Sequence, residues 1–189
     1  MRDSMKMTVR YQFLYMLFIQ AAASGIAFVF GMIAFWYFTN ISVAKEILSI
    51  VFMSLNFGLL YVTSKRFAIL DNKPYTPLKV SRIKAVLFGC FIALVNLLLV
   101  AVFKLVWIKY ATETGLSGFI PIALNAFFYC WSFPYNGIMN MSNGYMTIYS
   151  VIAMVVVPVA ATVTGYIAGL NKFEITEKID KFIYEKDND

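Results

Sequence analysis

Four long stretches of this chain contain no Asp, Glu, Lys or Arg. The charge-free stretches are residues 11–44, 47–64, 85–103 and 114–171. A helix needs about 20 mainly apolar residues to cross the roughly 30 Å of hydrocarbon in a bilayer, and each stretch is about that long or longer. Only 14% of the residues are charged, against about 25% in a typical soluble domain. These stretches predict a chain that folds in lipid.

The apolar runs are continuous, which indicates helices. Residues 26–30 and 97–100 are apolar at every position, whereas the strands of a membrane β-barrel alternate over about 10 residues. We therefore expect an all-α fold, a polytopic membrane bundle with four transmembrane helices. The expected helices are residues 12–39, 45–64, 84–109 and 146–170. The first apolar run is too long for a cleaved signal peptide, so the first helix is expected to be retained.

The distribution of Lys and Arg predicts how the helices are threaded. Thirteen of the 16 basic residues fall in residues 1–10, in the 64–84 connection or after residue 171. Because short cytoplasmic loops are enriched in Lys and Arg, we expect both termini and the 64–84 connection in the cytoplasm. The excess of Lys over Arg, 12 against 4, together with many Ile and Asn, is typical of an AT-rich bacterial genome, so the expected location is the inner membrane of a bacterium.

The 64–84 connection is the densest basic segment. The positive-inside pattern explains its charge and predicts contact with the anionic headgroups of the lipid bilayer, so no nucleic acid partner is expected. The basic residues of this cytoplasmic loop are Lys65, Arg66, Lys73, Lys79, Arg82 and Lys84.

Two segments lie outside the four expected spans. Residues 118–135 are apolar and aromatic and are bracketed by Pro121 and Pro134. We expect an interfacial or re-entrant helix on the outer face, although a fifth crossing would move the C-terminus outside. Residues 1–170 then form the transmembrane domain, and residues 171–189 form a cytoplasmic amphipathic tail. The tail is expected to be a helix of about three turns whose apolar face docks on the basic loop, with the membrane surface or a partner protein as the alternatives.

Small residues recur at four-residue spacing in the first and last expected helices. Such ridges let membrane helices approach closely, so we expect the two ridges to pack against each other, with a dimer seam as the alternative. The ridge residues are Ala23, Ala27 and Gly31 in the first helix, and Ala161, Gly165 and Gly169 in the last.

A few polar residues fall inside the expected spans. The buried polar set is Gln20, Asn56, Asn96 and Thr162. Asn56 and Asn96 lie near the middle of their helices, where lipid offers no hydrogen-bond partner. We expect an Asn56–Asn96 hydrogen bond that holds the two helices together, and the alternative is a polar floor for a small-molecule site.

No residue pattern in the chain indicates catalysis. There is no His, no paired carboxylate, no nucleophile beside a base and no grouping with metal-ligand spacing. No acid or base is expected at membrane depth, where ion-coupled transporters usually carry one. We therefore expect no enzyme activity and no cofactor or metal.

The sequence favours a function that depends on contacts. The first hypothesis is an accessory or scaffolding subunit of a membrane assembly, with a protein partner or a second copy of the chain and with the C-terminal helix and the basic loop as its cytoplasmic docking surface. The second is a small oligomeric permease or channel for a small solute, lined by the buried polar set. The third is a membrane-resident immunity or protection protein that uses the aromatic outer segment.

Overall fold

The computed structural model describes residues 8–37, 42–73, 80–113, 119–135 and 148–186. Within these ranges the chain is helical and contains no strand, which confirms the all-α class. The helices are α1 (Val9–Tyr37), α2 (Ser42–Asp71), α3 (Arg82–Glu113), α4 (Phe119–Ser132), the 3-10 turn η1 (Phe133–Tyr135) and α6 (Ile148–Lys186).

Four of these helices are long and apolar enough to cross a membrane. The four spans are Val9–Ala34, Ile47–Asp71, Arg82–Leu105 and Ile148–Asn171. Their outward faces carry large exposed apolar side chains, among them Phe18, Ile83 and Leu105. A soluble monomer rarely exposes apolar surface on this scale, so the chain has the build of a multi-pass membrane protein.

The second span is longer than the sequence patterns predicted. Helix α2 continues through Lys65 and Arg66 to Asp71, and α3 begins at Arg82. Charged residues do not end a helix, whereas Pro74 disfavours helical geometry at the residue before it. The expected loop is therefore shorter, and Lys79 lies outside the described residues.

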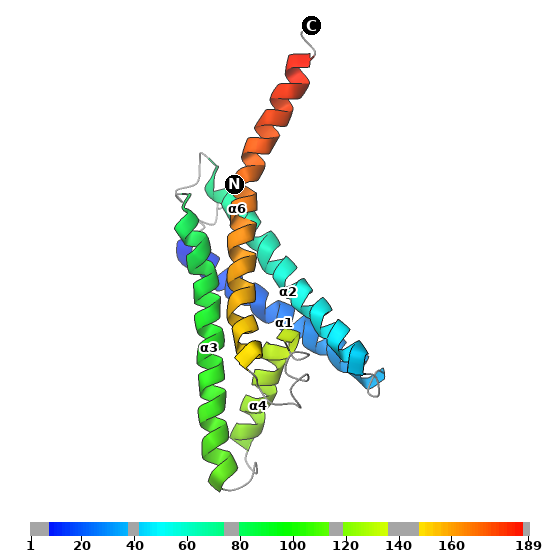
Figure 1. Ribbon diagram of the computed structural model, residues 1–189. Helices are drawn as coiled ribbons and strands as arrows, with labels where there is room; N and C mark the ends of the chain where they lie inside the picture. Colours follow the sequence, from blue (N-terminus) through cyan, green and yellow to red (C-terminus); the bar gives the residue numbers. More distant parts are fainter. Residues whose placement is uncertain (1–7, 38–41, 74–79, 114–118, 136–147, 187–189) are drawn as a thin grey trace, which may run out of the picture.

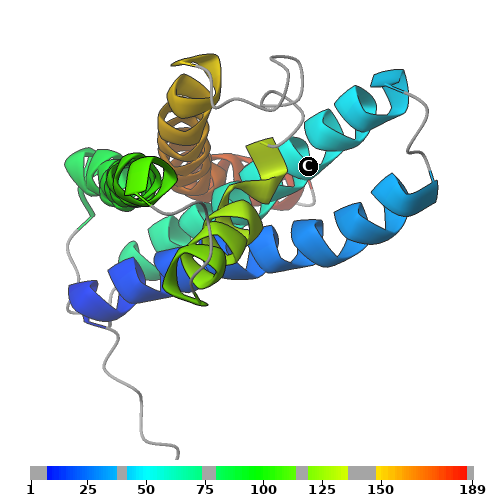
Figure 2. The same ribbon diagram turned by 90° about the horizontal axis from the view of Figure 1, so that it is seen from below.

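The helices form two pairs that cross each other. Figure 2 shows α1 and α2 side by side across the view, with α3 and α6 seen closer to end-on. Helix α6 packs against both α2 and α3, while α1 packs mainly against α2 (Figure 1). The start of α1, the end of α2 and the start of α3 lie at one end of the bundle (Figure 1), which we call the Asp71 end.

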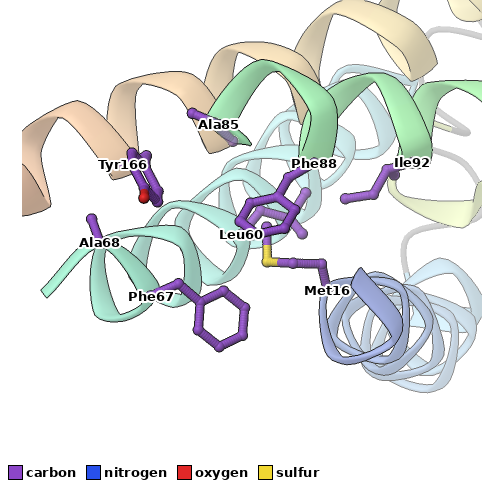
Figure 3. Close-up of a cluster of buried hydrophobic side chains, with 9 residues drawn as sticks. Met16, Leu60, Phe67, Ala68, Ala85, Phe88, Ile92 and Tyr166 are labelled. Carbon is purple, nitrogen blue, oxygen red and sulfur yellow. The ribbon is translucent and has the colours of Figure 1, made fainter. Parts of the chain in front are cut away.

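The main apolar core lies between the four spans. Met16 of α1 and Leu60 of α2 face Phe88 of α3, and all three side chains are fully buried (Figure 3). Phe67 and Tyr166 extend this core towards the Asp71 end. Two smaller clusters lie beyond it, one around Met154 and Phe128 and one formed by Ala27, Phe52 and Phe133.

The two small-residue ridges do not pack against each other, so that prediction was wrong. A methyl group added at Gly165 would meet the backbone of Tyr61, and one added at Gly169 would meet Lys65 and Ala68, so the α6 ridge packs on α2. On α1, Ala23 and Ala27 are buried and Gly31 is covered by the ring of Phe133. The sequence could not show that η1 would occupy this face of α1.

Helix α4 inserts into the bundle. Its 14 residues span about 21 Å at 1.5 Å per residue, which is too short to cross the hydrocarbon. It runs from the far end of α3 towards the middle of the molecule (Figure 1). There η1, whose three residues are buried, packs against α1 and α2. A helix of this length is compatible with the expected interfacial or re-entrant segment.

Helix α6 has no break where the tail was expected to begin. It is one helix of 39 residues, and the stretch after Asn171 extends away from the other helices (Figure 1). No Gly or Pro falls between residues 171 and 186, so nothing local turns the chain back. The expected docking of the tail on the basic loop is not seen among the residues that the structure describes, and residues 74–79 of that loop lie outside them.

Replacing Gly165 with Ala should lower the melting temperature, because the added methyl would push α6 away from the α2 backbone at Tyr61. Overpacking of this kind costs about 1–3 kcal/mol. The matched control is Gly58→Ala, where a methyl meets nothing within 4 Å and the helix gains roughly 0.5–1 kcal/mol. Thermal unfolding of both variants in the same detergent measures the difference, and equal melting temperatures would contradict a tight α2–α6 contact.

Candidate functional site

Four polar side chains, one from each spanning helix, meet at the Asp71 end of the bundle. Lys84 Nζ of α3 lies 2.5 Å from Asp71 Oδ2. The Tyr166 hydroxyl of α6 donates to the same oxygen at 2.8 Å, and Gln12 Nε2 of α1 donates to Asp71 Oδ1 at 3.0 Å. We call these four residues the Asp71 cluster.

The Asp71 cluster is enclosed. The Asp71 side chain is fully buried and the Lys84 side chain is 8% exposed. Asp71 is the last residue of α2, where the helix dipole disfavours a negative charge, and Lys84 compensates for it. The Lys84 ammonium also lies 5.8 Å from the centre of the Phe88 ring, within range of a cation–π contact.

The sequence patterns do not predict this buried ion pair. They place Lys84 in the cytoplasmic basic loop and predict no acid or base at membrane depth. The signal was present in the sequence: Asp71 is the only acid between residues 47 and 112, and it falls at the end of one span, 13 residues before Lys84. Of the other loop residues, Arg66 and Arg82 are exposed, whereas Lys65 and Lys73 are half-buried.

A second polar group lies near the middle of the bundle. The second span begins at Ile47, and Asn56 lies nine residues after it. This separation is about 14 Å along the helix axis. Asn56 Nδ2 donates to the Tyr135 hydroxyl at 3.1 Å. The amide of Gln20 lies beside the same hydroxyl, without a hydrogen bond of ordinary geometry. Together with Ser24, one turn further along α1, these residues form what we call the midpoint cluster.

Asn56 and Asn96 do not bond to each other, so that prediction was wrong. Asn96 Nδ2 donates to the Met154 carbonyl of α6 at 2.7 Å, and Trp131 Nε1 donates to Asn96 Oδ1 at 2.7 Å. The reason is the inserted segment, since α4 supplies Trp131 to Asn96 and η1 supplies Tyr135 to Asn56.

Thr162 does not belong to the midpoint cluster and makes its contacts within α6 and with α2 and α3. Its hydroxyl donates to the Val159 carbonyl within α6 at 3.1 Å, and its own carbonyl accepts a hydrogen bond from Ser64 Oγ of α2 at 2.7 Å. The side chain also lies where α6 comes close to Gly89 of α3. The predicted polar set is thus buried as a whole, but only Gln20 and Asn56 share a site.

Apolar residues separate the two polar sites. On α1, Met16 lies one turn from Gln12 and one turn from Gln20, and it packs with Leu60 and Phe88. On the other side of the midpoint cluster, Ala27, Phe52 and Phe133 pack together.

The described side chains do not form a metal centre. No three His, Cys, Asp or Glu residues lie together in the part of the chain that the structure describes. Cys90 is exposed on the outward face of α3, Cys130 is half-buried on α4, and both are free thiols. The chemistry that these sites offer is hydrogen bonding and charge pairing.

No protein-family model, curated protein or solved structure matches this chain.

Replacing Lys84 with Met should lower the free energy of unfolding by about 3–5 kcal/mol, because Asp71 would remain as a buried carboxylate without a cation. Adding Asp71→Asn to that variant should recover most of the loss, since it removes the uncompensated charge. The matched control is Arg82→Met on the same turn, which is exposed and should change stability by no more than about 0.5 kcal/mol. Unfolding in detergent measures all three, and equal losses in the two single variants would contradict the role of the ion pair.

Proposed function

We propose that this protein is an accessory or scaffolding subunit of a membrane assembly and has no catalytic activity of its own. The observation that carries the proposal is the length and course of α6. This helix spans the apolar layer and then continues for about 22 Å beyond Asn171, away from the other helices (Figure 1).

The position of α6 suits it to carry a docking segment. Its span is fixed on two sides, by the contact of Gly165 with α2 and by the close approach of Gly89 on α3. The bond from Ser64 to the Thr162 carbonyl adds a polar tie at the same level. A continuous helix held in this way gives the extension a defined direction relative to the membrane.

The sequence of the extension favours a protein partner. Apolar residues recur at the spacing of one helical face at Ile175, Ile179, Phe182 and Ile183. Residues 172–189 carry four Lys against six acids, and this net negative charge disfavours binding to an anionic membrane surface. The partner that fits is a protein with an apolar groove and a basic rim.

A small permease is the second candidate. The observation in its favour is the midpoint cluster, which places the amides of Gln20 and Asn56 in the interior of the bundle. The apolar layers on both sides of that cluster favour the scaffolding role, because a solute would have to displace them.

We also propose that both termini face the cytoplasm of a bacterial cell. Arg10, Arg66 and Arg82 are exposed near the Asp71 end, where the positive-inside rule favours the cytoplasm. A fluorescent reporter fused after Asp189 should be active, whereas alkaline phosphatase fused there should be inactive. A fusion after Glu113, at the opposite end of α3, should give the reverse result. Phosphatase activity at Asp189 would overturn the proposed orientation.

The docking role predicts a one-sided contact of the α6 extension. A photoreactive amino acid at Ile179 should give a protein adduct of one defined mass in native membranes. The matched position is Lys181, two residues further along the helix. It lies about 200° around the helix axis from Ile179, so it should give no protein adduct. Purification in a mild detergent should recover the same partner in a fixed ratio. Adducts to lipid alone from both positions would contradict the proposal.

A further inference from the structure

The midpoint cluster contains buried polar atoms that have no hydrogen-bond partner among the residues that the structure describes. These atoms are both amide atoms of Gln20, the hydroxyl oxygen of Ser24 and Oδ1 of Asn56. Each of the three residues is at most 1% exposed. Buried polar atoms in native proteins are normally paired with protein groups or with ordered water, so four such atoms within one cluster point to a bound molecule.

The residues that carry the unpartnered atoms lie on neighbouring faces of the bundle. Gln20 and Ser24 are four residues apart on α1 and therefore lie on the same face. Asn56 of α2 reaches that face through its hydrogen bond to Tyr135, whose hydroxyl also lies beside Gln20. The site is thus formed by α1, α2 and η1.

The chemistry of the site selects an uncharged ligand. None of the residues of the midpoint cluster carries a charge at neutral pH. The charges of the Asp71 cluster lie beyond the layer of Met16 and Leu60. Gln20 is eight residues from Gln12 of that cluster, or about 12 Å along the helix. An ion at the midpoint cluster would be buried without a counter-charge, which is strongly disfavoured.

The ligand must both donate and accept hydrogen bonds. An amide oxygen only accepts, an amide nitrogen only donates and a serine hydroxyl does both. The unpartnered atoms at Gln20, Ser24 and Asn56 include all three types. Water meets these requirements, and buried waters typically make about three hydrogen bonds to otherwise unpaired groups.

We propose that Gln20, Ser24, Asn56 and Tyr135 form an internal water-binding site that links α1, α2 and η1 in the middle of the bundle. The layer of Met16, Leu60 and Phe88 closes the site towards the Asp71 end, and the cluster of Ala27, Phe52 and Phe133 closes it on the other side. The water is therefore occluded and contributes to structure. This inference is independent of the proposed scaffolding function.

Radiolytic hydroxyl-radical labelling tests the site, because radicals formed from a bound water modify the side chains beside it. Tyr135 should be modified at least about tenfold faster than Phe88, although both are at most 1% exposed. The double variant Ser24→Ala with Asn56→Leu should reduce the rate at Tyr135 to that of Phe88. The matched variant Asn96→Leu should leave it unchanged. Equal rates at Tyr135 and Phe88 in the unmodified protein would overturn the proposal.

A stability measurement gives an independent test that needs only a mild substitution. If water satisfies the Ser24 hydroxyl, Ser24→Ala should lower the melting temperature by about 2–4 °C. Ser64→Ala is the matched control, because the Ser64 hydroxyl has a protein partner in the Thr162 carbonyl, and its melting temperature should fall by a similar amount. A rise in the melting temperature of Ser24→Ala would show that the hydroxyl is unpaired and would overturn the proposal.

Discussion

The close approach of α6 to α2 at Gly165 and Gly169 determines where the other helices of this bundle can lie. Apolar side chains gain little by leaving lipid for another apolar surface, so membrane helices associate through close packing and polar contacts. Two glycines one turn apart bring the α6 backbone against Tyr61 and Lys65. Helix α3 then packs on the other side of α6 at Gly89, and α1 is left to pack on α2 and on the inserted α4–η1 segment.

Polar contacts add specificity to this packing at two levels. At the Asp71 end, one carboxylate holds a side chain from each of the other three spanning helices. In the middle, the inserted segment supplies Trp131 to Asn96 and Tyr135 to Asn56. The same insertion covers Gly31 with the ring of Phe133. The α4–η1 segment therefore fills a space that the four spans alone would leave open.

The sequence predicts the features that each helix determines by itself and misses those that depend on a neighbour. The absence of charge over long stretches is a local property, and it located the four spans. The burial of Gln20, Asn56, Asn96 and Thr162 agrees with the cost of exposing polar groups to lipid. The partner of each amide depends on how deep residues 119–135 insert, and no periodicity reveals that depth. The Asp71–Lys84 pair was missed because positive charge beside a span was attributed to orientation alone.

The polar contacts at the Asp71 end and in the middle of the bundle also limit how far the spanning helices can move. A transporter has to exchange one set of interior contacts for another, and its polar groups must then face a path that opens to one side at a time. Here the Asp71 carboxylate holds all four spanning helices at one end, and the apolar layer of Met16, Leu60 and Phe88 separates it from Gln20 and Asn56. Moving any one spanning helix would break a contact to the Asp71 carboxylate, and moving α2, α3 or α6 would also disturb the packing at Gly165 or Gly89. A bundle tied in this way is better suited to hold α6 in a fixed position than to alternate between states, which supports the docking role that we propose for α6.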